Sequence, residues 1–248
     1  MNSLVWQGVC IALVALLVIW NRAEIGDPKW PLIGLGLIAA IWLLLALYII
    51  VSSLWLMFHG ASSSALSITS ATLAAVPVLA VATFVFAAQK VPTIYDISTD
   101  TINPPEFLLA NQHRHRSHNS LSYDSANAAR QKNAYPNIKP LVIDESPQAV
   151  MASVTAVIET LGWQLHGNNY GVISSNAMVI EAYTRTPLLG FVDDIVVRVT
   201  PKNTDSNPNS TFSRIDVRSV SRVGESDLGA NAKRIRLFLD NLSDHLSR

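Results

Sequence analysis

The N-terminal part of the chain holds long runs of apolar residues separated by short polar breaks. Three such runs extend over Leu4–Trp20, Trp30–Phe58 and Ala65–Ala88, and no Asp, Glu, Lys or Arg occurs from Pro31 to Gln89. A helix needs roughly 20 apolar residues to cross a bilayer, so a charge-free stretch of this length is typical of membrane-spanning segments. The pattern predicts a transmembrane region over residues 1–89 with three α-helical spans.

The few charges that flank the predicted spans bear on their orientation. Three spans put the first loop, with Arg22 and Lys29, on the same side of the membrane as Lys90 and the residues after it. The opposite side has no Lys or Arg, so the positive-inside rule favours a cytoplasmic C-terminal domain. No charged residue lies within a span, which gives no support to an ion pathway or a proton relay. We expect a multi-pass protein of the cell inner membrane, with the lipid bilayer as a partner.

Residues 90–140 show little periodicity and are rich in Asn, Ser, Pro and His. The stretch NPPEF (103–107) enforces an extended backbone around its two prolines. The run NQHRHRSHN (111–119) has histidines that can bind a metal, but it lacks a fixed geometry and a carboxylate close by, so a solvated linker is the preferred interpretation. The segment predicts an extended, loop-rich arm without a metal site or a cofactor.

Regular periodicity returns in residues 141–248. Ser146 followed by Pro147 is typical of a helix start, and apolar residues at helical spacing follow until Gly162 ends the pattern. Alternating stretches then predict strands over residues 163–173, 178–185, 191–202 and 212–222. A last helix is expected after Asp227, which is a strong N-cap candidate. Its apolar stripe consists of Leu228, Ala232, Ile235, Leu239 and Leu242.

These elements predict the fold class. The chain is expected to be an α-helical transmembrane anchor followed by an α+β domain, built as a helix, a four-stranded antiparallel meander and a second helix. Both helices would lie on one face of the sheet, which leaves the other face open to solvent. The charged residues expected on that face or at its end are Glu181, Asp194, Arg198, Asp216, Arg218, Arg222 and Asp227.

The charged face has two interpretations. Opposite charges on neighbouring antiparallel strands form cross-strand pairs that keep a solvent-facing sheet soluble, and this structural role is the simpler one. The alternative is a binding face, in which the arginines act as planar, bidentate donors to a polar or anionic ligand. Asp193 and Asp194 should point to opposite faces of one strand, so they are not expected to act as a catalytic pair. No catalytic residue and no metal ligand is assigned.

Composition excludes several classes of function. The 18 basic and 18 acidic residues cancel, and a nucleic-acid-binding surface normally leaves a basic excess, so no nucleic acid is expected as a partner. The single cysteine, Cys10, excludes an intrachain disulfide and a cysteine metal cage. Walker loops, zinc-ligand spacings and a Ser-His-Asp order are also absent from the sequence.

Several stretches of the soluble half together resemble one known family. They are VPTIYDISTDTINPPEF (91–107), AYPNIKPL (134–141), GW (162–163), IEAYTRT (180–186), GFVDDIVVRV (190–199) and IDVRSVSRVGESDLGANAKRI (215–235). Over about Val91–Phe238 the chain resembles domain of unknown function 1499, a family of bacteria and plastids. The resemblance implies an extracytoplasmic domain, because many soluble members of that family look exported. We prefer this implication to the charge rule, but it supplies no activity.

The sequence therefore favours a non-enzymatic, membrane-anchored module of the bacterial envelope that binds or scaffolds another component. Its partner would be an envelope protein or a small polar or anionic ligand, engaged by the charged sheet face. One alternative is an enzyme acting on an envelope or lipid-derived substrate, with Asp193 or Asp194 as base and Arg218 or Arg222 as an electrostatic clamp. The other alternative is an accessory subunit of a membrane complex.

Overall fold

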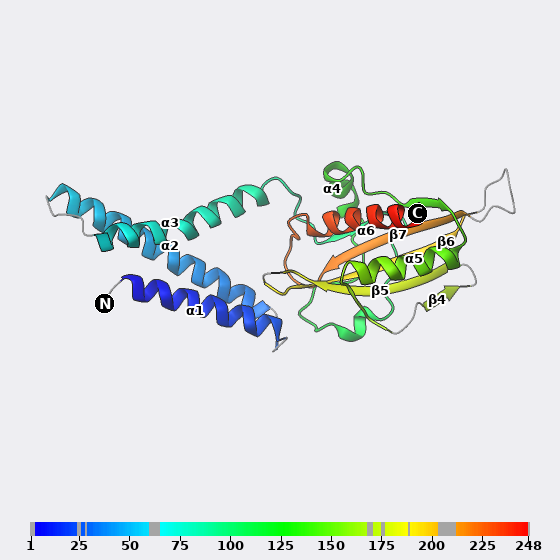
Figure 1. The fold of residues 1–248 in the computed structure, drawn as a ribbon, viewed down its shortest axis with the longest axis horizontal. Helices are drawn as coiled ribbons and strands as arrows, with labels where there is room; N and C mark the ends of the chain where they lie inside the picture. The colour runs from blue at the N-terminus through cyan, green and yellow to red at the C-terminus, as the bar shows by residue number, and fades with distance from the viewer. Residues whose placement is uncertain are drawn as a thin grey trace. The chain divides into compact units, whose positions relative to one another are not determined.

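The computed structural model describes residues 3–23, 26–27, 29–59, 65–167, 171–174, 177–187, 189–202 and 212–247 of the 248-residue chain. The chain divides into two compact units (Figure 1). The first unit comprises Met1–Lys90 with Leu188–Gly190, and the second comprises Val91–Pro187 with Phe191–Arg248. The boundary after Lys90 coincides with the change from apolar to polar sequence.

The first unit contains three helices: α1 (Ser3–Arg22), α2 (Lys29–Phe58) and α3 (Ala65–Ala88). By length and composition, α1 and α2 are candidate membrane spans over Val5–Arg22 and Lys29–Ser52. Gly34 of α2 faces α1, where an added Cβ would lie only 2.8 Å from a methyl carbon of Leu17. A glycine here lets the two helices pack closely. The third predicted span forms a helix, α3.

The second unit contains a seven-stranded antiparallel sheet. Its strands are β1 (Asp96–Ser98), β2 (Leu141–Asp144), β3 (Gln164–Leu165), β4 (Gly171–Ser174), β5 (Ala177–Arg185), β6 (Val192–Pro201) and β7 (Phe212–Ser221). The main order is β1-β7-β6-β5-β3, with β2 also paired to β7 and β4 also paired to β5.

The predicted four-stranded meander is therefore only partly right. Strands β5, β6 and β7 are consecutive antiparallel neighbours, as the alternation predicted. The first predicted strand, over residues 163–173, is instead two short strands, β3 and β4, which pair separately with β5. Two further short strands, β1 and β2, occupy different parts of the free edge of β7. Strands of three and four residues carry too few alternations to be detected in a sequence.

Helices α5 (Pro147–Thr160) and α6 (Ala230–Leu246) cover one face of the sheet, as expected (Figure 1). The main hydrophobic core lies between them and the strands, and Trp163 stacks on Phe238 in it at a ring distance of 5.4 Å. The predicted start of α5 is confirmed, because the Ser146 hydroxyl accepts a hydrogen bond from the N–H of Ala149 at 3.3 Å.

The start of α6 differs from the prediction. The N-cap position is Gly229, with a φ of 82°, and not Asp227. Asp227 still supports the first turn, because its carboxylate accepts hydrogen bonds from the N–H groups of Gly229 and Asn231, each at 2.8 Å. Leu228 does not join the apolar stripe, since its φ is 54° and its side chain is 42% exposed. Phe238 takes a core position in the stripe instead.

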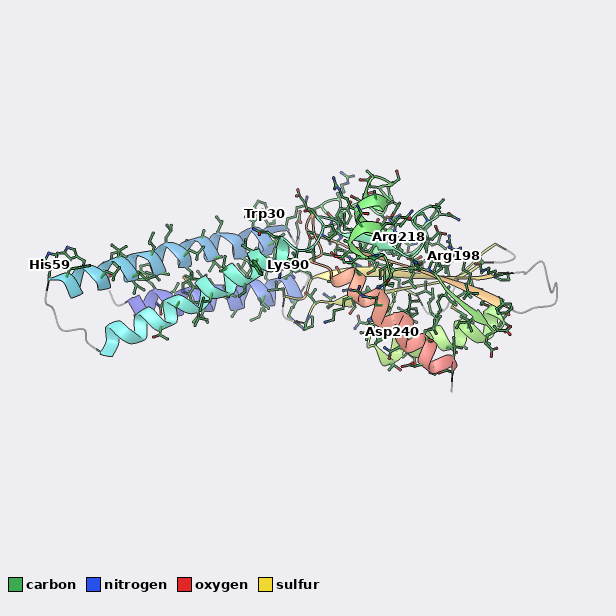
Figure 2. All side chains as sticks on the ribbon, turned by 90° about the horizontal axis from the view of Figure 1, so that it is seen from above. Trp30, His59, Lys90, Arg198, Arg218 and Asp240 are labelled. Atoms are coloured by element: carbon green, nitrogen blue, oxygen red, sulfur yellow. The ribbon has the colours of Figure 1, made fainter. Side chains whose placement is uncertain are left out.

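The opposite sheet face is not open to solvent, and this expectation was wrong. The segment predicted as an arm contributes β1, the short 3-10 helix η1 (Ala110–His113) and α4 (Asn127–Ala134) to the second unit. Phe107 and Ala110 of this segment pack on Val179, Val196 and Val220 of the sheet. We call residues 96–123 the covering segment. Figure 2 shows Arg198 and Arg218 on this face, on the other side of the sheet from α6 and Asp240.

Candidate functional site

Asp194 of β6 lies at the centre of a largely buried charged cluster, which we call the Asp194 cluster. Its side chain is 0% exposed, and three side chains from distant parts of the chain donate to it. Arg114 Nε lies 2.7 Å from Oδ2 and His166 Nε2 lies 2.8 Å from Oδ1. Arg222 donates to both oxygens, from Nε at 3.0 Å and from Nη2 at 2.8 Å. The cluster joins the covering segment to β6 and to the residues that directly follow β3 and β7.

Electrostatics keep Asp194 ionised. Burial alone would raise the pKa of Asp194, but the hydrogen bonds from His166 and Arg222, with the charges of Arg222 and Arg114, outweigh burial and hold that pKa well below its usual range. Both carboxylate oxygens are occupied by these donors. A permanently ionised, enclosed carboxylate of this kind is suited to fixing a structure and not to taking a proton from a substrate.

Arg218 of β7 forms a second buried pair, with Asp96 of β1. The guanidinium donates to both carboxylate oxygens, from Nε at 2.9 Å and from Nη2 at 2.7 Å. It also donates to the backbone carbonyls of Pro105 at 3.1 Å and Leu121 at 2.7 Å. Burial raises the pKa of Asp96, and the hydrogen bonds and charge of Arg218 oppose that rise. The pair fixes both ends of the covering segment to the sheet.

Asp216 of β7 forms a third group, which is closer to solvent. Arg198 Nη2 lies 3.1 Å from its Oδ2, and Arg214 donates to it from Nε at 3.0 Å. Arg214 Nη2 also lies 2.8 Å from Oδ2 of Asp100 in the covering segment. The hydroxyl of Thr99 donates to Asp216 Oδ1 at 3.3 Å. The residues predicted to form a solvated ladder are therefore internal partners of the covering segment.

Glu181 of β5 holds the covering segment through its backbone. Its carboxylate is 4% exposed and accepts hydrogen bonds from the N–H groups of Leu108, Leu109 and Ala110 at 2.5 to 3.1 Å. These donors lie at the start of η1, where the first N–H groups of a helical turn have no partner within the turn. Glu181 thus satisfies the backbone of the segment that covers it.

Replacing Glu181 with glutamine should loosen the covering segment. Glutamine has one acceptor oxygen where the carboxylate has two, and its NH₂ group would face backbone N–H donors. We expect the free energy of unfolding to fall by about 2–3 kcal/mol, since buried donors lose their partners. Urea unfolding of the full-length protein in detergent measures this, and hydrogen exchange of residues 108–110 should accelerate. The control Glu159→Gln, on the exposed side of α5, should change neither quantity.

The structure separates the two neighbouring aspartates, as the alternation predicted. Asp193 contacts Arg234 of α6, with Oδ2 2.5 Å from Nη2, whereas Asp194 faces the covering segment. Sequence reasoning missed Arg114, His166 and Asp96 as partners of the charged strands. Arg114 stands within the histidine-rich run that was interpreted as a solvated linker. No His, Cys, Asp or Glu group suited to hold a metal ion occurs among the residues that the structure describes.

The histidine-rich run gives the domain a dependence on pH. Burial, together with the charges of Arg222, Arg114 and His115, lowers the pKa of His118 to about 4. His118 Nδ1 accepts a hydrogen bond from the N–H of His115 at 3.1 Å, which requires the unprotonated nitrogen. The unfolded chain binds this proton more readily, so folding stability is full above about pH 6.5 and falls as the pH decreases towards about 4.

We expect His118→Gln to reduce this loss of stability between about pH 6.5 and about pH 4. The measurement is the free energy of unfolding of the full-length protein in urea over this pH range. His245→Gln, on the exposed surface of α6, serves as the control and should retain the wild-type pH dependence. An unchanged slope in the His118 variant would contradict the assignment.

A cleft of about 460 Å³ opens in the covering segment, and we call it the Tyr123 cleft. Its lining consists of Asn103, Pro104, Glu106, Phe107, Asn111, Ser120, Leu121, Ser122, Tyr123 and Arg218. Arg218 stacks near the rings of Phe107 and Tyr123, each 5.3 Å from the guanidinium carbon. The volume falls within the range of roughly 300–1,000 Å³ that small-molecule sites occupy. The carboxylates of Asp194, Asp216 and Glu181 do not line this cleft.

The Tyr123 hydroxyl is the one buried polar group of the cleft lining for which the described residues offer no hydrogen-bond partner. Burial, with a smaller effect of the Asp96 carboxylate, raises the pKa of Tyr123 to about 12. The hydroxyl therefore keeps its proton at physiological pH and can act as a donor. A buried hydroxyl without a protein partner destabilises a fold, so its presence calls for a physical reason such as an ordered water or a ligand that reaches it.

Comparison with known proteins places the second unit in a family. A search of the curated proteins finds no match. A family model described as "Protein of unknown function (DUF1499)" matches residues 96–242. The matched region runs from β1 to α6, and it includes the covering segment, the Asp194 cluster and the Tyr123 cleft.

Proposed function

The chain belongs to the DUF1499 family, and on that premise we propose that it is a membrane-anchored binding protein of the bacterial envelope. Its anchor would consist of three spans in the inner membrane, formed by α1, α2 and α3. The apolar character of α1 and α2 supports this, because most large hydrophobic side chains along them are exposed and suited to lipid contact. The sequence of α3 contains no charged residue, which supports a third span.

The observation that carries the binding function is the buried Tyr123 hydroxyl at a polar cleft. The surrounding framework is rigid, since Arg218 below the cleft is held by four hydrogen bonds and two aromatic rings. A binding site of this kind positions a few polar groups in a preformed hollow. The hydroxyl is buried, so the tyrosine side chain would have to rotate towards the cleft before a ligand accepted its hydrogen bond, and that contact would remove the unsatisfied donor.

An enzyme that uses Asp194 as base and Arg222 as clamp has less support. The two side chains hydrogen-bond to each other, and Asp194 has no exposed surface, so a substrate would have no route to its oxygens. The second proposed base, Asp193, is 3% exposed and pairs with Arg234. The pairing of Asp194 with Arg114 and Arg222 stabilises the covering segment, and the pair of Asp193 and Arg234 joins β6 to α6. These roles account for their burial.

We expect Tyr123→Phe to separate binding from stability. The hydroxyl has no protein partner, so its removal should leave the free energy of unfolding unchanged or raise it by about 1 kcal/mol. Ligand binding should weaken, because the donor is lost. Loss of stability in the variant would instead assign the hydroxyl a structural role and contradict the proposal.

Binding can be measured with a fluorophore at the rim of the Tyr123 cleft. Ser125 is exposed, lies two residues after Tyr123 and does not line the cleft, and Cys10, the single native cysteine, can be replaced by alanine, so Ser125→Cys allows selective labelling beside the cleft. The labelled full-length protein is titrated with a set of small polar metabolites. A saturable change that Tyr123→Phe weakens supports the proposal, and the absence of such a change throughout the set overturns it.

Topology tests the envelope location separately. C-terminal fusions to alkaline phosphatase and to a fluorescent protein that matures only in the cytoplasm report the side on which the second unit lies. We expect phosphatase activity and no fluorescence, in line with the extracytoplasmic location that the family resemblance implies. Fluorescence without phosphatase activity would place the domain in the cytoplasm, as the charge rule favours, and would remove the envelope from the proposal.

A further inference from the structure

We infer that the ligand of the Tyr123 cleft is a small, hydroxyl-rich molecule that carries an ammonium group, an inference that rests on the proposed binding function. The cleft presents one carboxylate that is free to pair, one guanidinium that is already neutralised and several uncharged hydrogen-bonding groups. Each of these observations restricts the ligand independently.

The free carboxylate is Glu106. It lines the cleft, its side chain is exposed, and no hydrogen bond or ion pair holds it among the described residues. It lies between Pro105, whose carbonyl binds Arg218, and Phe107, whose ring packs on the sheet, so its backbone is fixed at both neighbours. A carboxylate held at the edge of a polar cleft attracts a cation and forms a charge-assisted hydrogen bond with an ammonium group.

The guanidinium of Arg218 does not turn the cleft into an anion site. Its charge is balanced by the bidentate contact with Asp96, and two backbone carbonyls accept two further hydrogen bonds, so four of its five N–H groups have partners. A third carboxylate, Asp124, lies next to Tyr123 in sequence and contributes a negative potential at its hydroxyl. The charged lining residues are Glu106 and Arg218, and because Asp96 balances Arg218, the charge left to pair with a ligand is that of Glu106. This disfavours the anionic ligand that the arginines suggested in the sequence.

The uncharged groups of the cleft match hydroxyls. The lining holds the amides of Asn103 and Asn111 and the hydroxyls of Ser120 and Ser122, all of which belong to exposed residues. Amides and hydroxyls can both donate and accept, as the hydroxyls of a polyol do. The apolar lining side chains are few, among them Phe107 and Leu121, so a mainly hydrocarbon ligand would leave polar groups of the cleft without partners.

Three sugars of one ring size test the inference with the labelled full-length protein described above, in lipid nanodiscs. Glucosamine, glucose and glucuronate differ from one another by one or two ring substituents, which are cationic, neutral and anionic. At a pH where the amine is protonated, we expect glucosamine to bind roughly tenfold more tightly than glucose, as one added charge-assisted hydrogen bond gives. Glucuronate should bind most weakly.

The variant Glu106→Gln identifies the source of the preference. It should remove the advantage of glucosamine over glucose while the unfolding transition stays unchanged, because Glu106 has no structural partner among the described residues. Glu225→Gln changes an exposed carboxylate that does not line the cleft, so it is the matched control and should retain the preference.

Equal or tighter binding of glucose or glucuronate, compared with glucosamine, overturns the inference and leaves the binding function standing. A preference for glucosamine that survives Glu106→Gln has the same consequence. If none of the sugars binds while another metabolite of the set does, the ligand class is wrong, and if no metabolite binds, the binding function fails too.

Discussion

Replacing Asp194 with asparagine is expected to destabilise the second unit by about 3–5 kcal/mol. The substitution keeps the shape of the side chain but removes the one negative charge that Arg114 and Arg222 share. Asparagine offers one acceptor oxygen in place of two, so a guanidinium would remain buried without a counter-charge. A loss of this size is a large fraction of the 5–15 kcal/mol that a domain usually has, and much of the protein should be unfolded or degraded in the cell.

Urea unfolding of the full-length protein in detergent measures the effect, and Asp240→Asn on the exposed side of α6 is the matched control. The same substitution at Asp240 should change the free energy of unfolding by less than about 0.5 kcal/mol. A loss below about 1 kcal/mol for Asp194→Asn would show that the two arginines find other partners, and it would contradict the role assigned to the Asp194 cluster.

The same carboxylate predicts a loss of stability in acid. Because the folded-state pKa of Asp194 is lowered, its contribution is fully present above the unfolded value of about 4 and is lost as the pH falls through the folded value. Wild-type protein should therefore lose stability below about pH 4, and Asp194→Asn should lose less over the same range. A steeper loss in the variant than in the wild type would contradict this assignment.

Local patterns in the sequence predicted the parts of the fold that depend on periodicity. Ser146 and Pro147 marked the start of α5 correctly, and the alternation around Asp193 and Asp194 placed the two carboxylates on opposite faces. These predictions succeed because a cap or a strand alternation is decided by neighbouring residues. The strand pairing of β5, β6 and β7 follows from the same alternation and from the short distance between the strands in sequence.

The covering segment could not be predicted in this way. An Asp or Arg that alternates with valine gives the same sequence pattern whether its face is solvated or buried against charged partners. The partners that decide the matter are far away in sequence, as Arg114 is from Asp194 and Asp96 is from Arg218. Beyond the three residues of β1, the segment lacks periodicity because it is held mainly by side-chain contacts and by the acceptor oxygens of Glu181, and not by a strand ladder or a long helix.

Replacing Arg218 with methionine should destabilise the second unit by about 3–5 kcal/mol at neutral pH. Methionine fills much of the same volume but leaves the carboxylate of Asp96, whose side chain is 4% exposed, without its counter-charge. Burial already raises the pKa of Asp96, and removal of Arg218 should raise it further. A raised folded-state pKa means that the folded state takes up the proton more readily, so the loss should be smaller at about pH 5 than at about pH 8.

A second substitution distinguishes an uncompensated charge from a simple loss of packing. In Arg218→Met combined with Asp96→Asn no charge remains at the site, so part of the lost stability should return and its pH dependence should disappear. Arg214→Met on the same strand is the control, because its side chain is 37% exposed and its partner Asp216 keeps Arg198, so we expect a loss of about 1 kcal/mol or less. If the double variant were less stable than Arg218→Met at every pH, the destabilisation would come from the lost contacts with Phe107, Tyr123 and the two backbone carbonyls. The ion pair with Asp96 would then contribute less to stability than the contacts by which Arg218 holds the lining of the Tyr123 cleft.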